Sequence, residues 1–225
     1  MPSIYIIALL VMLASWLVQA GLKSRFAKYS KIRLPNGMTG KQVAEKMLHD
    51  NGIYDVRVES VPGKLTDHYN PATKIVNLSE PVYATSSVAA AAVAAHECGH
   101  AVQHARAYHF LQMRSSLVPV VSFASRWVTW ILIAGIIFLQ SFPELLLAGI
   151  GLFAVTTLFS FITLPVEINA STRAVAWLNE AGITDFETHP QAKSALRWAA
   201  YTYVVAALGS LATLLYYIMI YMRRR

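Results

Sequence analysis

The chain is poor in cysteine and in charge. Cys98 is the single cysteine among 225 residues, which excludes a disulfide within the chain and agrees with a catalytic portion that faces the cytoplasm. Charged residues make up 14% of the sequence and hydrophobic residues 56%. An ordinary soluble domain carries about 25% charged residues. We therefore expect an integral membrane protein.

Acidic residues are also scarce, with 12 Asp and Glu against 19 Lys and Arg and a net charge of +7. The basic residues gather directly after the first apolar run and at the end of the chain (Lys23, Arg25, Lys28, Lys31, Arg33; Arg223, Arg224, Arg225). These are juxtamembrane positions, where lipid headgroups and membrane orientation explain them. The lipid bilayer is thus an expected partner, and nucleic acid is not.

Four apolar runs are long enough to cross a bilayer. The first, Ser3–Gly21, has about 19 residues, close to what a helix needs to cross a membrane. Cleavage after Ala20 as a signal peptide is the alternative, but the basic residues follow this run instead of preceding it, which favours a retained anchor. Residues 117–140 and 145–165 predict a transmembrane hairpin with Arg126 inside its first leg, either buried or reaching the membrane surface. The alternative is that the membrane portion starts only at Trp127. Residues 199–222 predict a fourth helix.

Between the first two runs the sequence has the pattern of a small α+β unit. We expect a short amphipathic helix over residues 39–48, a strand over 56–60 and a hairpin of residues 65–69 and 74–79. A long helix starts at Ser86-Ser87 and continues past Tyr108. Proline suits the start of a helix, so Pro165 predicts a new helix over residues 166–179.

The prediction is therefore a mostly α membrane protein with about four transmembrane helices and a small α+β, zincin-like metallopeptidase portion. Its segments are an N-terminal anchor (1–22), a catalytic portion (23–116), a transmembrane hairpin (117–165), a helical region with the third ligand (166–198), and a C-terminal transmembrane helix with a basic tail (199–225). With the polar segments in the cytoplasm of a prokaryotic cell, both termini lie outside the plasma membrane, and the three final arginines violate the positive-inside rule.

The motif His96-Glu97-Cys98-Gly99-His100 lies in an alanine-rich, helix-favouring run. Histidines four residues apart share one helix face and can bind one zinc ion, while the glutamate acts as a base. Cys98 points about 200° away from His96 around the helix. We expect Cys98 to be a packing residue and Zn²⁺ to be the cofactor.

A catalytic zinc site needs a third protein ligand. His104 lies two turns from His96, about 12 Å along the axis, so one ion cannot bind both, and His109 is further still. Glu167 follows an apolar run and returns to the same side of the membrane as the motif. By itself it reads equally well as a ligand or as a carboxylate that stabilises a helix N-terminus.

Several ordered motifs resemble the YugP-type family of membrane zinc metallopeptidases. They are Met38-Thr39-Gly40, Leu65-Thr66-Asp67-His68-Tyr69-Asn70-Pro71, Leu78-Ser79, Val82-Tyr83, His96-Glu97-Cys98-Gly99-His100-Ala101 and Leu164-Pro165-Val166-Glu167-Ile168-Asn169-Ala170-Ser171. The match runs from Met38 to the last apolar segment. The chain is more distantly similar to the HtpX and CAAX-type prenyl protease group. In that group a Glu-x-x-x-Asp motif lies downstream of the His-Glu motif, and its Glu is the third zinc ligand.

The resemblance implies that His96, His100 and Glu167 bind zinc and that Glu97 is catalytic. Ser171 occupies the position of the group's aspartate, and either Ser171 or Asn169 is left to orient a ligand histidine. Candidates for stabilising the oxyanion are Arg173, His189, Tyr201 and Tyr203. The strand that contains Asp67, His68 and Tyr69 corresponds to the strand that pairs with substrate, with a plain sheet edge as the alternative.

The expected function is an integral-membrane zinc metalloendopeptidase that cleaves membrane-associated or misfolded proteins through zinc-activated water. Two alternatives stay open. One is a protease that processes modified, prenyl-type peptides. The other is a catalytically silent membrane scaffold stabilised by zinc. The expected partners are a peptide or membrane-protein substrate and lipid, and the sequence leaves the oligomeric state open.

Overall fold

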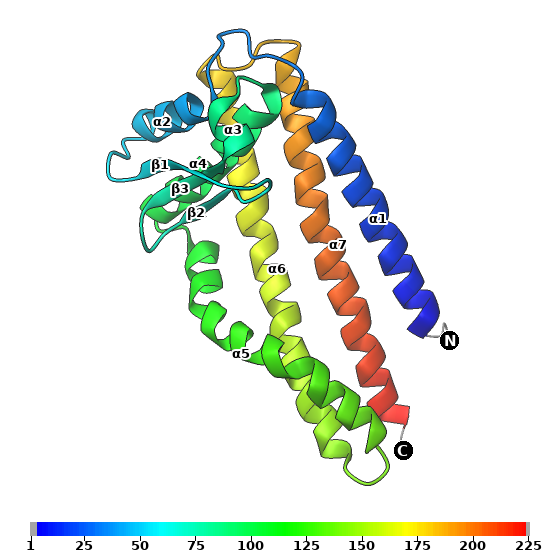
Figure 1. The fold of residues 1–225 in the computed structure, drawn as a ribbon. Coiled ribbons are helices and arrows are strands. Elements are labelled where there is room, and N and C mark those ends of the chain that lie inside the picture. Colours follow the sequence, from blue (N-terminus) through cyan, green and yellow to red (C-terminus); the bar gives the residue numbers. More distant parts are fainter. Residues whose placement is uncertain (1–3, 224–225) are drawn as a thin grey trace.

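The computed structural model describes residues 4–223 and is mostly helical with one small sheet (Figure 1). This confirms the predicted fold class at that level. The elements in chain order are α1 (Ile4–Tyr29), α2 (Gly40–Asp50), β1 (Arg57–Val61), β2 (His68–Asn70), β3 (Ile75–Ser79), α3 (Glu80–Ala84), α4 (Val88–Ala105), α5 (His109–Ile137), α6 (Pro143–Glu180) and α7 (Thr188–Arg223).

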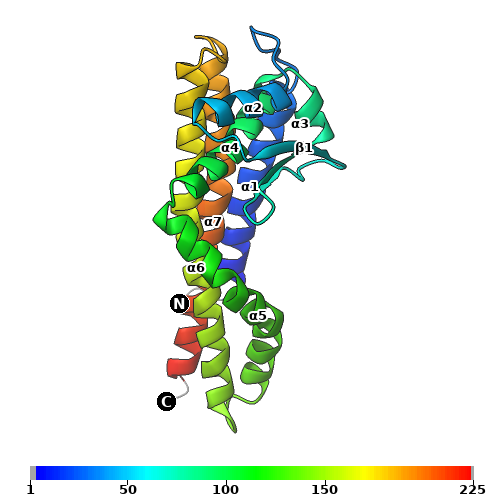
Figure 2. The same ribbon diagram turned by 90° about the vertical axis from the view of Figure 1, so that its left-hand side faces the viewer.

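Four of the described helices, α1, α5, α6 and α7, are long and apolar enough to cross a membrane. They run lengthwise through the molecule, and α2, α3, α4 and the sheet cover one end (Figures 1 and 2). The start of α1, the turn between α5 and α6 and the end of α7 lie at the opposite end. Residues 1–3 of the predicted anchor (1–22) and Arg224 and Arg225 of the predicted basic tail lie outside the described residues.

Helix α1 packs mainly against α7 and continues through its basic residues to Tyr29. A side chain added at Gly21 would overlap the Trp198 ring, at 2.1 Å, so only glycine allows this close approach. The Arg25 guanidinium lies 4.0 Å from the centre of the same ring, and its Nε donates to Ser194 Oγ at 3.3 Å. These contacts keep the basic end of α1 helical and attached to α7.

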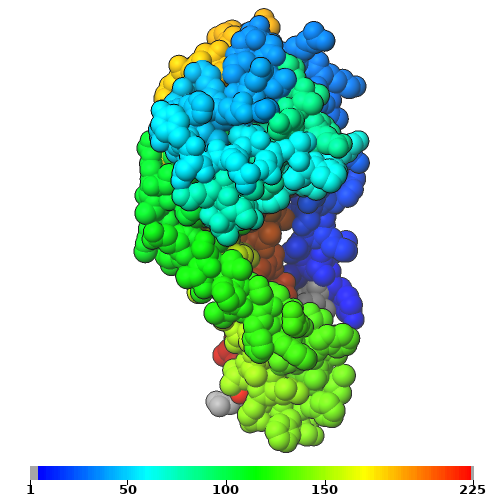
Figure 3. Space-filling view, turned by 60° about the vertical axis from the view of Figure 1, so that its left-hand side comes forward, coloured from blue at the N-terminus to red at the C-terminus, as the bar shows by residue number. Residues whose placement is uncertain are grey.

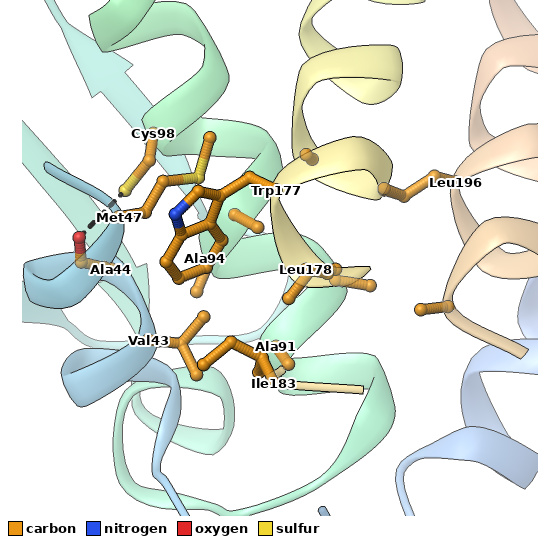
Figure 4. Close-up of a cluster of buried hydrophobic side chains, with 14 of the residues drawn as sticks. Val43, Ala44, Met47, Ala91, Ala94, Cys98, Trp177, Leu178, Ile183 and Leu196 are labelled. Carbon is orange, nitrogen blue, oxygen red and sulfur yellow. Dashed lines mark hydrogen bonds between the residues drawn. The ribbon is translucent and has the colours of Figure 1, made fainter. Parts of the chain in front are cut away.

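The compact end of the molecule forms around α4. Thr39 caps α2 in a capping box with Gln42, and the Ser87 hydroxyl accepts from the backbone of Ala90 at the start of α4. Buried side chains of α2, α4, α6 and the segment after α6 meet in one apolar cluster (Figure 4), among them Val43, Met47, Ala94, Leu178 and Ile183. The cluster fixes α4 between α2 and α6.

The sheet has the strand order β1-β3-β2, with β1 parallel and β2 antiparallel to β3. The predicted hairpin is therefore confirmed, and β2 is an edge strand. The short helix predicted over residues 39–48 and the strand predicted over residues 56–60 are also present, as α2 and β1, with boundaries shifted by one or two residues.

Two helix boundaries differ from the prediction. Helix α4 ends at Ala105 instead of continuing past Tyr108, because Ala107 adopts a left-handed conformation (φ 49°) that turns the chain into α5. Pro165 does not begin a helix but lies inside α6, which continues from Pro143 to Glu180. A proline removes only one backbone hydrogen bond, and packing against α4, α5 and α7 supports the helix around it.

The first leg of the predicted hairpin, α5, contains Pro119 and changes direction along its length (Figure 1). Arg126 is exposed on this helix, so the alternative of a buried arginine is wrong. The hairpin itself is present, with α5 and α6 packed together around Leu132 and Leu146.

Candidate metal centre

The structure brings together the three residues expected to bind zinc. His96 and His100 come from α4 and Glu167 comes from α6, and their ligand-type atoms lie within 4.8 Å of one another. Glu167 Oε2 lies 3.3 Å from His96 Nε2 and 3.5 Å from His100 Nε2. The Glu167 side chain is 4% exposed, so its charge needs compensation within the protein.

The spacing of these atoms fits a metal better than a hydrogen-bonded ion pair. Charged N–H···O bonds are usually about 2.7–2.9 Å long, shorter than both contacts. Glu167 Oε2 is buried and, within the described residues, lacks a partner with hydrogen-bond geometry. Ligands about 2.0–2.1 Å from a tetrahedral zinc ion are about 3.3–3.4 Å apart, close to the two distances observed here. The donor set therefore fits zinc.

The charge of Glu167 also acts on the histidines. Burial alone lowers the pKa of His100, but the contact with Glu167, the charge of Glu97 and the contact with Gln103 together outweigh burial and raise it. The two carboxylates thus attract positive charge to His100, whether that charge is a proton or a metal cation. Metal binding must displace any such proton, because only the neutral imidazole is a ligand.

Both histidines have a polar partner on the ring nitrogen that faces away from Glu167. Ser171 Oγ lies 3.1 Å from His96 Nδ1, and Gln103 Oε1 lies 3.0 Å from His100 Nδ1. The Gln103 amide then donates to the Val166 carbonyl and to Asn169 Oδ1, at 2.8 and 3.0 Å. These contacts orient each imidazole toward the metal position and tie α4 to α6.

Glycine permits this close approach of the two helices. A Cβ atom at Gly99 would lie 2.7 Å from the Ala170 carbonyl oxygen and 3.1 Å from its Cα. Such contacts are too short for any side chain. Gly99 therefore lets α6 approach α4 closely enough for Glu167 to reach both histidines.

Glu97 lies between the histidines in sequence, and its Oε2 accepts a hydrogen bond of 3.0 Å from the Tyr69 backbone N–H. Tyr69 is in the edge strand β2, so the carboxylate is held against the sheet. Asp67, in turn, accepts from the backbone and hydroxyl of Ser79 at 2.7 and 3.0 Å, which fixes the start of this strand.

These groups border one cavity of about 330 Å³. Its polar side holds the metal ligands and Glu97, and its other walls come from β2, α5, α6 and α7, with Asp67, His68, Tyr69, Pro71, Leu111, Arg114, Ser115, Val118, Phe159 and Tyr203. The strand predicted to bind substrate therefore borders the same cavity as the metal ligands. Of the residues named for the oxyanion, Tyr203 alone lines it.

The remaining candidates lie elsewhere. Arg173 Nε donates to Asn169 Oδ1 at 2.8 Å, so both belong to the polar contacts behind the ligands. His189, at the start of α7, contacts Thr184, and Tyr201 packs against Trp198. Neither lines the cavity.

Two side chains rejected as zinc ligands on sequence grounds, His104 and Cys98, have other partners. The His104 ring accepts from or donates to the Tyr69 hydroxyl at 2.8 Å, outside the metal group, as its spacing predicts. Cys98 is buried, and its thiol donates to the Ala44 carbonyl at 3.5 Å, on the side of α4 that faces α2 (Figure 4). Burial raises the pKa of this thiol, so it stays protonated and serves as a packing residue.

Sequence reasoning missed Gln103 and Arg114. Gln103 is fully buried three residues after His100 on the same helix, a spacing that places both side chains on one face. Arg114 Nη1 lies 3.4 Å from Glu167 Oε1, and the other carboxylate oxygen, Oε2, faces the histidines. In sequence, Arg114 reads as one more basic residue near a membrane segment.

Comparison with known proteins agrees with this geometry. Residues 4–222 match the family described as "Putative neutral zinc metallopeptidase". The chain is 44% identical over 211 residues to "Putative membrane protease YugP" of Bacillus subtilis (strain 168), which covers 94% of this chain and 93% of that protein. No solved structure matches. The chain therefore belongs to this family of zinc metallopeptidases, with His96, His100 and Glu167 as the group able to hold the metal.

Proposed function

We propose that the protein is an integral-membrane zinc metalloendopeptidase with a zincin-like catalytic portion of the gluzincin type. The observation that supports this most directly is the convergence, in one cavity, of two histidines and a glutamate in metal-binding geometry, a second glutamate, and an edge strand. A structural zinc site would be closed by a fourth protein ligand, whereas this group of three borders an open cavity.

Each residue at the site has a role in peptide hydrolysis. Bound zinc lowers the pKa of water and polarises a carbonyl group. Glu97 Oε2 is held by the Tyr69 N–H, and its other oxygen accepts a proton from the attacking water and passes it to the leaving amine. Tyr203, which lines the cavity, donates its hydroxyl in a hydrogen bond to the oxyanion. The edge strand β2 binds the substrate as an added strand.

The site lies where α6 leaves the apolar layer. Glu167 follows Pro143 by about 24 residues, or ~36 Å of helix at ~1.5 Å per residue, which exceeds a hydrocarbon thickness of roughly 30 Å. Phe159, in the same cavity, lies two turns lower, within that thickness. The cavity therefore extends from the membrane surface into the apolar layer.

This position indicates the substrate class. A peptide that reaches the cavity must have residues at or near the membrane boundary, as membrane proteins and misfolded membrane-associated chains do. The surface below the sheet is hollowed between α5 and α1, where α7 is visible (Figure 3). We propose that the catalytic portion faces the cytoplasm of a prokaryotic cell, because most basic residues lie at that end of the molecule.

The test is Glu97→Gln in the purified full chain in detergent or liposomes. Zinc content should match the wild type, and cleavage of casein or of a single-span membrane substrate should fall by at least about a hundredfold, as expected when a general base is lost. Glu80→Gln, an exposed glutamate outside the cavity, is the matched control. A zinc-loaded wild type that cleaves no substrate would instead support the silent scaffold.

A further inference from the structure

A second cavity, of about 470 Å³, adjoins the first. It lies between the last turn of α4, the first turns of α5 and the turn that follows β2. Its walls are partly apolar and partly polar, with Pro71, Ala72, Gln103, His104, Ala107, Tyr108, Leu111, Gln112 and Ser115. The mechanism described above does not use it.

The two cavities form one groove. They share Pro71, Leu111 and Ser115 as lining residues. Along α4, the lining residues of the second cavity lie on average about six positions beyond those of the first, or ~9 Å at ~1.5 Å per residue. An extended peptide covers that distance with about three residues at ~3.3 Å each.

The residues of α5 show which part of a substrate would lie in each cavity. Helix α5 descends from the compact end, where Leu111 and Gln112 line the second cavity, toward Val118, which lines only the first. The second cavity is therefore further from the apolar layer. A chain that emerges from the membrane reaches the metal centre first and the second cavity next.

We infer that the second cavity is a recognition subsite that takes an apolar side chain about three residues from the scissile bond, on the water-facing flank of a membrane-protein substrate. This inference rests on the proposed peptidase function. Leu111, Ala107 and Pro71 supply the apolar walls, and Gln112 and Ser115 supply polar groups at its border that can meet the peptide backbone.

One hydrogen bond links this subsite to the catalytic strand. Tyr69 offers its backbone N–H to Glu97, and its hydroxyl lies 2.8 Å from His104 Nδ1 in the wall of the second cavity. The same residue thus sets the position of the base and the wall of the subsite. A peptide in the groove contacts both ends of this link.

The experiment fills the second cavity and leaves the metal ligands intact. Gln112→Trp places a bulky ring in the cavity, and Ser116→Trp, on an exposed position of the same helix outside both cavities, is the control. Fluorogenic peptides carry either leucine or aspartate three residues from the scissile bond. Zinc content and thermal unfolding of each variant show that it is folded.

In the wild type, kcat/KM should be at least about tenfold higher for the leucine peptide, the value expected for one well-buried apolar side chain. Gln112→Trp should reduce this preference to less than about threefold, within the spread of context effects on a single apolar contact, and Ser116→Trp should leave it unchanged. If the preference for the leucine peptide over the aspartate peptide is the same in the wild type and both tryptophan variants, the subsite is overturned.

A binding measurement separates this inference from the proposed function. In the zinc-loaded Glu97→Gln background, the labelled leucine peptide should bind about tenfold more weakly after Gln112→Trp and with unchanged Kd after Ser116→Trp. This result would support the subsite even if no cleavage occurs. Binding that is the same in both variants would exclude it, whatever the activity of the wild type.

Discussion

Ser171 Oγ lies 3.1 Å from His96 Nδ1, on the side of the imidazole opposite Glu167. The serine occupies the position at which the prenyl protease group, which the sequence resembles distantly, has an aspartate. A hydroxyl can accept the imidazole N–H, but it does so without the negative charge that makes a carboxylate a stronger partner. The first ligand is therefore oriented by a neutral group.

Removal of this contact should weaken zinc binding. We expect Ser171→Ala to lower zinc affinity by about 10- to 100-fold, the usual effect of losing a group that orients a ligand histidine. Ser171→Asp should raise the affinity above that of the serine protein. Competition with a fluorescent zinc chelator measures both, and an alanine variant with wild-type affinity would show that the contact does not orient His96.

Glu167→Ala tests the third ligand. Loss of a direct ligand should reduce zinc affinity by more than the roughly 100-fold that marks the upper range for indirect partners. Glu180→Ala, an exposed glutamate at the end of the same helix, should bind zinc like the wild type. Unchanged stoichiometry and affinity in the Glu167 variant, measured by metal analysis and chelator competition, would remove Glu167 as a ligand.

Gly99→Ala tests the close approach of α4 and α6. The added methyl group would lie 2.7 Å from the Ala170 carbonyl oxygen, so the helices must separate, at a cost of about 1–3 kcal/mol in the free energy of unfolding. Zinc affinity should fall together with the free energy of unfolding. Gly151→Ala on α6 meets no atom within 4 Å and should be neutral or slightly stabilising. Thermal unfolding in detergent compares the two.

Arg114→Gln tests the cation beside the third ligand. Because the Arg114 side chain is one-third exposed, solvent screens its attraction to Glu167. Zinc affinity should therefore change by no more than about fivefold, the equivalent of ~1 kcal/mol. Arg126→Gln, an exposed arginine lower on α5, serves as the control. A loss as large as that of Glu167→Ala would mean that Arg114 fixes the carboxylate itself.

The parts of the site that follow a local pattern were predictable. The four-residue spacing of His96 and His100 follows from helix geometry, and the same geometry excluded His104 and placed Cys98 on the opposite face. The structure confirms these positions. The role of Glu97 as the base stays a prediction.

The parts that depend on tertiary packing were not predictable from local patterns. Glu167 reads equally well as a helix-terminal carboxylate until α6 is placed beside α4, so its assignment needed the family resemblance. Gln103 and Arg114 carry no motif and gain their meaning only from Asn169 and Glu167 across the helix interface. Packing also keeps α6 continuous through Pro165, against the local rule for proline.

The order of the ligands along the chain also affects when the metal centre can form. A ribosome completes His100 well before Glu167, and at about 5–20 residues per second the interval between them is roughly 3–13 s. During that interval the chain has His96, Glu97 and His100 but no third residue for the metal group. Glu167 can reach them only after α6 has packed against α4, so we expect the metal centre to form after the α5–α6 hairpin is complete.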